Sequence, residues 1–450
     1  MTAEALNVTR TLAQFVVDSR FEAIPEPVTH EAKRALLHWI GCAIGGSHER
    51  SVDSALAAVS LFSGSRQAGV FGRSERLDVL RAAFVNGVST DVLSFSDTHP
   101  VTLIHPTGVL GPALAALAEY RQVTGRDLLH ALILGFEVAS RVSLAVYPWH
   151  YDRGWHITGT AGTFGAGAAV AKVLRFDVQR LVWTLGIAAT SAAGLRGMFG
   201  SMCKNFHSGR AAENGLLAAF LAQQGFDSVP DGIGAPRCFA HVLGDSPNLD
   251  AAVRSLGETY EISKNTYKAY PCGVVIHPVI DGCVDIASAE NVDPRNVVAV
   301  NIRGNPFLLE LTGRKAPTTT LEGKLSVFHA AAAALVARRV GEQEFADAFI
   351  RRDDVIALRE KVSVRPDTTV REDEAHVVVS LGDGRAFSRH VEHAAGTAER
   401  PMTDREIEAK FRGLCEPYLA AARIDALIDR CWNITDLENA AALMQLATVE

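Results

Sequence analysis

Over the first 265 residues, apolar side chains recur at the three-to-four-residue spacing of helices, and alternating strand patterns are nearly absent. Turn-forming residues such as Gly45-Gly46 separate the periodic stretches. The expected helices include residues 11–17, 32–44, 109–121, 128–142, 162–173 and 210–224. This part of the chain therefore predicts an all-α domain.

The pattern changes after residue 265. Residues 297–303 and 361–365 alternate apolar and polar side chains, as half-buried strands do. Residues 376–391 read as a hairpin closed by Gly382-Asp383-Gly384, because an Asp-Gly pair favours a tight turn. Helical spacing at 277–289 and 321–340 lies between these strands. Residues 266–397 therefore predict a small α+β domain.

Helical patterning returns near the end of the chain. Thr403 followed by Glu406 is a capping-box signature that predicts a helix start. We expect this terminal helix to pack on the first domain, which makes the α+β unit an insertion. The predicted fold is mainly α, with a large all-helical domain from residues 1–265 and 398–450 and a smaller α+β domain from residues 266–397.

Charge and cysteine content narrow the functional class. The net charge of −7 argues against a nucleic-acid partner, which normally needs a basic face. Seven scattered cysteines without a C-x-x-C pair suit a reducing compartment and give no sign of a metal cluster. We expect no signal peptide, because charged residues interrupt the N-terminal stretch, and we read the apolar segment 157–174 as a buried helix rather than a membrane span. The chain is expected to be cytoplasmic.

Four short segments concentrate polar residues next to glycine or proline, each just before an expected helix. They are residues 94–108, 154–159, 204–210 and 268–273, with His277 nearby. Histidine can act as an acid or a base near neutral pH, and lysine can do the same when partly desolvated or can fix an anion. Two or three such cations would suit a substrate that carries several carboxylates.

Each feature also has a purely structural interpretation. His105 or His156 before a helix can be a cap or a satisfied core group, Lys204 a solvated side chain, and Tyr270 a core aromatic. The glycines at 159, 162, 165 and 167 lack the order of a dinucleotide-binding loop and favour close helix packing.

A metal site and the common catalytic motifs find little support. His390-Val391-Glu392-His393 resembles a metal-binding set, but strand alternation would place His390 and His393 on opposite faces. We therefore predict no metal ligands. No P-loop, nucleophile elbow or H-E-x-x-H motif occurs in the sequence. Acid/base chemistry without a cofactor is the leading enzymatic class.

At these same positions the sequence resembles the MmgE/PrpD family, whose members include 2-methylcitrate dehydratase, cis-aconitate decarboxylase and iminodisuccinate epimerase. The resemblance runs nearly end to end. It is carried by residues 32–46, 83–87, 97–98 with 104–106, 154–159, 186–188, 204–215, 268–271, 317–326 and 401–404.

The resemblance implies a homodimer whose site lies between a helical domain and a smaller α+β lid domain, and it implies a small polycarboxylate substrate. It assigns proton transfer and carboxylate binding to four residues, His105, His156, Lys204 and Lys268. It assigns positioning of those groups or of the substrate to four others, Asp97, Thr98, His207 and Tyr270.

The chain also departs from the family pattern. Ser94 and Ser96 stand where the family often has aspartates, and Gly273 stands where a histidine is common. A family tyrosine upstream of Pro317 has no obvious counterpart near Glu310 and Leu311. These changes affect groups expected to select the substrate.

Three functions are compatible with this pattern. The first is a lyase, in which a base removes a proton next to a carboxylate and water or carbon dioxide leaves. The second is an epimerase, in which the proton returns to the opposite face; the loss of aspartates at 94 and 96 favours it, because epimerisation expels no leaving group. The third is a polycarboxylate-binding protein that keeps the fold without turnover.

Overall fold

The computed structural model describes residues 6–449, and the chain divides into two compact units. The first unit comprises Met1–Asn265 and Thr403–Glu450, and the second comprises Thr266–Met402. The second boundary lies five residues after the predicted 397/398. Residues 398–402 stay with the second unit, where Arg400 forms an ion pair with Asp281 at 3.0 Å and accepts a backbone hydrogen bond from Gly396 at 2.9 Å.

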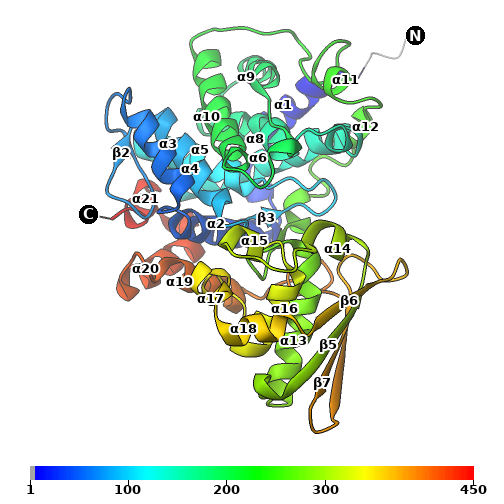
Figure 1. The fold of residues 1–450 in the computed structure, drawn as a ribbon. Coiled ribbons are helices and arrows are strands. Elements are labelled where there is room, and N and C mark those ends of the chain that lie inside the picture. The colour runs from blue at the N-terminus through cyan, green and yellow to red at the C-terminus, as the bar shows by residue number, and fades with distance from the viewer. Residues whose placement is uncertain (1–5, 450) are drawn as a thin grey trace. The chain divides into compact units, whose positions relative to one another are not determined.

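The first unit is built from helices (Figure 1). Its longer helices are α1 (Val8–Asp18), α2 (Glu26–Gly45), α3 (Arg50–Ser60), α4 (Val79–Val92), α5 (Thr107–Tyr120), α6 (Gly125–Val146), α8 (Ile157–Val173), α9 (Val178–Ser191), α10 (Cys203–Gln223), α19 (Asp404–Cys415) and α20 (Ala421–Trp432). Its shorter elements are α7 (Trp149–Asp152), α11 (Phe239–Leu243), α12 (Leu249–Val253), α21 (Ala441–Leu446), β1 (Ala68–Gly69), β2 (Arg76–Leu77) and β3 (Asp97–Thr98).

Helix α8 forms the centre of this unit and packs against α5, α6, α9 and α10. It is buried from Ile157 to Ala171, which confirms that the apolar segment is a core helix. Its glycines allow the close packing predicted from the sequence: a Cβ at Gly165 would lie 2.6 Å from both the Gly135 carbonyl oxygen of α6 and the Ala139 Cβ. Side chains larger than hydrogen would push α6 and α8 apart at this point.

Within residues 6–449, one helix, α6, is long and apolar enough to cross a membrane by length and composition alone. The share of its most apolar window that is buried inside the fold is 94%. A core helix of a globular unit has this property.

The C-terminal helices return to the first unit, as expected. Thr403 and Glu406 form the predicted capping box at the start of α19. Helix α19 packs on α2, where the Phe411 ring lies against Gly41 and a Cβ on that glycine would come within 2.9 Å of the ring. The unit is therefore assembled from both ends of the chain.

The second unit contains a four-stranded sheet in the order β6-β5-β7-β8. Its strands are β5 (Val297–Gly304), β6 (Val362–Pro366), β7 (Ala375–Leu381) and β8 (Ala386–Val391), and a short strand, β4 (Thr266–Tyr267), precedes them. Its helices are α13 (His277–Ala289), α14 (Phe307–Thr312), α15 (Thr320–Gly323), α16 (Val327–Ala337), α17 (Asp347–Ile350) and α18 (Asp353–Arg359). Strand β5 pairs parallel with β6 and antiparallel with β7.

One face of this sheet is covered by α13, which packs on β7 and β8, and α16 packs on α13 (Figure 1). Along β7 the side chains of Ala375, Val377, Val379 and Leu381 are buried in that core, and the alternate side chains are half-buried. The predicted hairpin is confirmed, with β7 and β8 joined through Gly384 at φ +91°.

The single helix predicted over residues 321–340 is wrong. The chain forms α15, then a break, then α16, because Ser326 adopts an extended conformation and its hydroxyl accepts the backbone N–H of His329 as an N-cap. The helical spacing of apolar residues continues across the break, so the sequence pattern alone did not reveal the N-cap at Ser326.

Candidate active site

His105 lies in the loop between α4 and α5, and its ring orientation is set by local backbone. Its Nδ1 lies 2.7 Å from the Asp97 carbonyl oxygen and 3.1 Å from the Thr98 hydroxyl. A carbonyl oxygen only accepts, so Nδ1 must carry the proton and the imidazole lone pair of the neutral ring resides on Nε2. The His105 backbone N–H donates to the Thr158 hydroxyl on α8 at 3.1 Å, which ties the loop to the core helix.

The Asp97 side chain points elsewhere and supports this loop. It is buried and accepts hydrogen bonds from the Thr107 hydroxyl and from Asn265 Nδ2, the latter at 3.1 Å. Burial raises the pKa of the Asp97 carboxyl to about 6, against the lowering effect of these hydrogen bonds. Asp97 therefore positions His105 through its backbone carbonyl, while its side chain holds the loop on its neighbours.

His156 and His207 come from two different helices and meet through their Nδ1 atoms at 2.9 Å. His156 is the N-cap residue of α8, and His207 lies in the second turn of α10. The Leu195 backbone N–H donates to His207 Nε2 at 3.4 Å, so a neutral His207 carries its proton on Nδ1 and donates it to His156. His156 must then carry its own proton on Nε2.

Both of these imidazoles are kept neutral at pH 7. Burial, reinforced by the Lys204 ammonium, lowers the pKa of His156 well below its ordinary value. Burial also lowers the pKa of His207, although the Asp91 carboxylate acts to raise it. The ring centroids of His105 and His156 are 6.3 Å apart, and the hydrogen bonds of the two rings place the proton of the neutral form on Nδ1 in His105 and on Nε2 in His156.

Lys204 belongs to a buried ion pair on the same side of the unit. Its Nζ lies 2.7 Å from Asp91 Oδ1, and the exposed fractions of the two side chains are 18% and 1%. Burial acts to raise the pKa of Asp91, but Lys204, His105 and other neighbours outweigh it and hold that pKa well below its ordinary value. An ammonium has three N–H donors, so the pairing with Asp91 occupies one of them.

Two serines complete the surroundings of Asp91. The Ser96 hydroxyl donates to Asp91 Oδ1 at 3.1 Å, and the Ser208 hydroxyl donates to Oδ2 at 3.3 Å. An aspartate at position 96, as the family often has, would place a second carboxylate against a buried one. The uncharged serine at 96 therefore leaves one carboxylate, that of Asp91, to pair with the Lys204 ammonium.

The sequence-predicted residues thus divide into two groups. The first unit brings together Asp97, Thr98, His105, His156, Lys204 and His207. The second unit carries Lys268, which is half-buried in the segment after β4, and Tyr270. The Tyr270 hydroxyl donates to Asp281 Oδ1 on α13, and burial followed by the Asp281 charge raises the pKa of the phenol.

Two details differ from the sequence interpretation. The segment 204–210 lies inside the first two turns of α10 and not before a helix, since α10 begins at Cys203. Asp91 was missed altogether. The signal that could have found it is a carboxylate that ends the otherwise uncharged stretch 82–91 of α4, where a buried ionised side chain needs a charged partner.

Comparison with known proteins adds to this description. The MmgE/PrpD N-terminal domain matches residues 10–252, and the MmgE/PrpD C-terminal domain matches residues 270–434. The cis-aconitate decarboxylase-like protein oryM of Aspergillus oryzae is 27% identical over 98% of this chain and 96% of its own.

Two further relatives are similar over nearly their whole length. Cis-aconitate decarboxylase of Homo sapiens is 26% identical, covering 98% of this chain and 94% of its own. Cis-aconitate decarboxylase of Aspergillus terreus is 24% identical, covering 98% of this chain and 95% of its own. With both family domains matched in order along a fold assembled as the resemblance implied, the chain belongs to the MmgE/PrpD family.

Proposed function

We propose that this protein is a lyase that acts on a small di- or tricarboxylate by acid/base chemistry of its own side chains, with decarboxylation of a cis-aconitate-like substrate as the first candidate. Two observations support the proposal. The relatives carry the name of a decarboxylase. In the first unit, two neighbouring imidazoles also have hydrogen bonds that favour opposite proton positions.

The positions of the protons on His105 and His156 support this proposal. His105 is held with its lone pair on Nε2, so it is suited to accept a proton. His156 is held with its proton on Nε2, so it is suited to donate one. Burial keeps His156 neutral, and the Nε2–H of the neutral ring can donate to negative charge that develops on a substrate. We therefore assign His105 as the base and His156 as the acid.

This pair fits either elimination that the family resemblance implies. In a decarboxylation, the bond to one carboxylate breaks, its electron pair shifts through the adjacent double bond, and the far carbon takes the proton of His156. In a dehydration, His105 takes the proton next to a carboxylate, and the departing hydroxide takes the proton of His156. Both end with one neutral product, carbon dioxide or water, and a new or shifted double bond.

Lys204 is assigned to substrate binding. Its ammonium charge is balanced by Asp91, so the pair as a whole is neutral, but its remaining N–H donors can bind a carboxylate. Asp91, Ser96 and Ser208 then hold Lys204 in one position. The roles of Lys268 and Tyr270 stay predictions from the family resemblance.

The test is to incubate the purified chain with cis-aconitate, citrate and 2-methylcitrate separately. Carbon dioxide release is measured for the first, and alkene absorbance is followed for all three. The expected result is turnover of at least one substrate that His156→Gln reduces by about 10²-fold or more, since glutamine keeps a donor near Nε2 but supplies no proton. Absence of turnover on all three would reject the lyase.

Epimerisation is the second candidate, and Ser96 favours it. A serine there donates to Asp91, where the family often has a carboxylate, and epimerisation expels no leaving group. The discriminating measurement is solvent deuterium at the α-carbon of a dicarboxylate recovered without elimination. Deuterium exchange without elimination supports epimerisation, and elimination without deuterium exchange supports the lyase.

The proposal keeps the homodimer and the cytoplasmic location expected from the sequence. Light scattering coupled to gel filtration tests the first, and cell fractionation tests the second. A monomer in solution at working concentration would contradict the expected assembly.

A further inference from the structure

The solvent side of the β7–β8 hairpin carries a cluster that the proposed function does not use. His376 on β7 and His390 on β8 are paired residues in the antiparallel register. Their imidazoles stack with centroids 4.0 Å apart and an interplanar angle of 5°. Directly opposite residues of a pair point to the same face, and the adjacent positions Ala375, Val377 and Val391 are the ones turned into the core.

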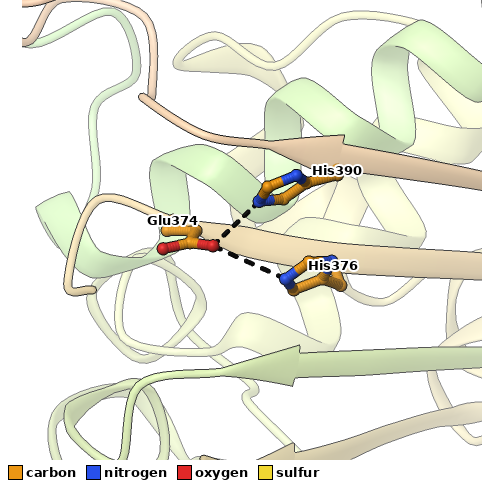
Figure 2. Close-up of side chains that lie close together, drawn as sticks. All are labelled: Glu374, His376 and His390. Carbon is orange, nitrogen blue, oxygen red and sulfur yellow. Dashed lines mark hydrogen bonds and ion pairs between the residues drawn. The ribbon is translucent and has the colours of Figure 1, made fainter. Parts of the chain in front are cut away.

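Glu374, immediately before β7, completes the cluster, and Figure 2 shows its carboxylate facing both rings. Its Oε1 lies 2.8 Å from His390 Nε2 and 3.5 Å from His376 Nε2. One ligand atom from each residue, a ring nitrogen from each histidine and a carboxylate oxygen, lies within 4.8 Å of the other two. Donor atoms around one tetrahedral zinc ion are separated by roughly 3–3.5 Å, so small side-chain rotations would bring this set onto an ion.

The surroundings hold the carboxylate in this orientation. Arg371 contacts the other oxygen, with Nη1 3.4 Å and its backbone N–H 3.3 Å from Glu374 Oε2. The oxygen that faces the imidazoles is therefore selected by a neighbouring group, as in many metal sites.

We infer that Glu374, His376 and His390 form a binding site for a divalent first-row transition metal ion, with zinc as the reference ion. Two imidazoles and one carboxylate are the donor types that such ions prefer over magnesium or calcium. A neutral imidazole can carry its proton on Nδ1, which leaves Nε2 of each ring for the ion. Three protein ligands leave a coordination position for water, and the partial exposure of the site gives the ion access.

The proposed site includes His390, which the sequence interpretation set aside as a ligand. His390 and His393 do belong to different clusters, because His393 Nδ1 lies 2.6 Å from Asp373 and its set is completed by Glu399. The partner of His390 is His376, which the hairpin supplies. His393 offers a single imidazole between two carboxylates, so it is a weaker site for zinc and provides the matched control.

The experiment is a calorimetric zinc titration of the full-length, metal-stripped chain without a polyhistidine tag. His376→Ala and His390→Ala are each expected to lose one equivalent of bound zinc relative to the wild type. Glu374→Gln should weaken that equivalent by about tenfold or more, because an amide oxygen is a poorer ligand. His393→Ala and His241→Ala, the latter an exposed histidine of α11, should retain it.

A second readout identifies the donors. Cobalt(II) should give visible d–d absorption bands with the wild type that are reduced in the three site variants and kept in the two controls. His376→Gln, which retains most of the side-chain volume, replaces the alanine variant if circular dichroism shows that the latter is unfolded. Equal zinc stoichiometry in the wild type and both histidine variants would overturn the inference. So would loss of the same equivalent in His393→Ala.

Discussion

The Nδ1 atoms of His156 and His207 lie 2.9 Å apart, although the residues belong to two helices and are 51 positions apart in the chain. A hydrogen bond between two identical ring nitrogens requires one to donate and the other to accept. The Leu195 N–H decides the direction, because it donates to the remaining nitrogen of His207. The Leu195 N–H therefore sets, through His207, which nitrogen of His156 carries the proton.

His207 should therefore act as a positioning residue. His207→Leu removes the donor to His156 and is expected to lower kcat by about 10- to 100-fold with little change in KM. His207→Asn, whose Nδ2 takes the place of the imidazole Nδ1, should recover part of the loss. Steady-state kinetics with a pH profile measures both, and equal loss in the two variants would show that the donor is unimportant.

The Lys204–Asp91 pair should matter for stability as well as for turnover. Lys204→Met leaves a carboxylate with 1% side-chain exposure without its ammonium partner, and it should lower the free energy of unfolding by about 3–5 kcal/mol. Urea denaturation followed by circular dichroism measures this. The double variant Asp91→Leu/Lys204→Met should be more stable than Lys204→Met, because it removes the buried charge. A double variant less stable than the single one would contradict the reasoning.

Asp97 should give the first unit a specific pH dependence. Burial raises its pKa from 3.8 to about 6 in the folded state, so the folded protein holds the proton more tightly than the unfolded chain does. Stability must therefore fall as pH rises from about 4 to about 6. Asparagine does not titrate, so the stability of the wild type relative to Asp97→Asn should decline by on the order of 3 kcal/mol across that range.

Denaturation midpoints of both proteins at pH 4.5, 5.5, 6.5 and 7.5 test the pH prediction. Asp285 offers a comparison, since Asp285→Asn removes a carboxylate of the second unit whose side chain is exposed. A constant difference between wild type and Asp97→Asn over this range would show that the Asp97 carboxyl titrates alike in the folded and unfolded states.

Gly159 should be irreplaceable in the first turn of α8. A Cβ at this position would lie 2.4 Å from the Ala193 carbonyl oxygen and 3.1 Å from the His207 Cβ. Gly159→Ala is expected to cost about 1–3 kcal/mol of stability and to displace His207 from His156. Gly197→Ala is the matched control, because nothing lies within 4 Å of a Cβ built there. Thermal denaturation and kcat should change only in the first variant.

Local patterns determined a large part of the fold. The apolar spacing predicted α1, α2, α5, α6, α8 and α10 of the first unit, the Thr403–Glu406 capping box predicted the start of α19, and alternation predicted the strands. A hairpin centred on Asp383 also implies that His376 pairs with His390, since each histidine lies seven residues from Asp383. These features succeed because they depend on interactions within a few residues or across one turn.

The proton positions and ion pairs were decided only by the tertiary structure. Lys204 and Asp91 are separated by 113 positions, and the sequence around either residue does not indicate that the two form an ion pair. The tautomers of His105 and His156 depend on a loop carbonyl and on a neighbouring helix. Such contacts require helices from distant parts of the chain to pack to within a fraction of an ångström, and that packing comes from the whole core rather than from any local pattern.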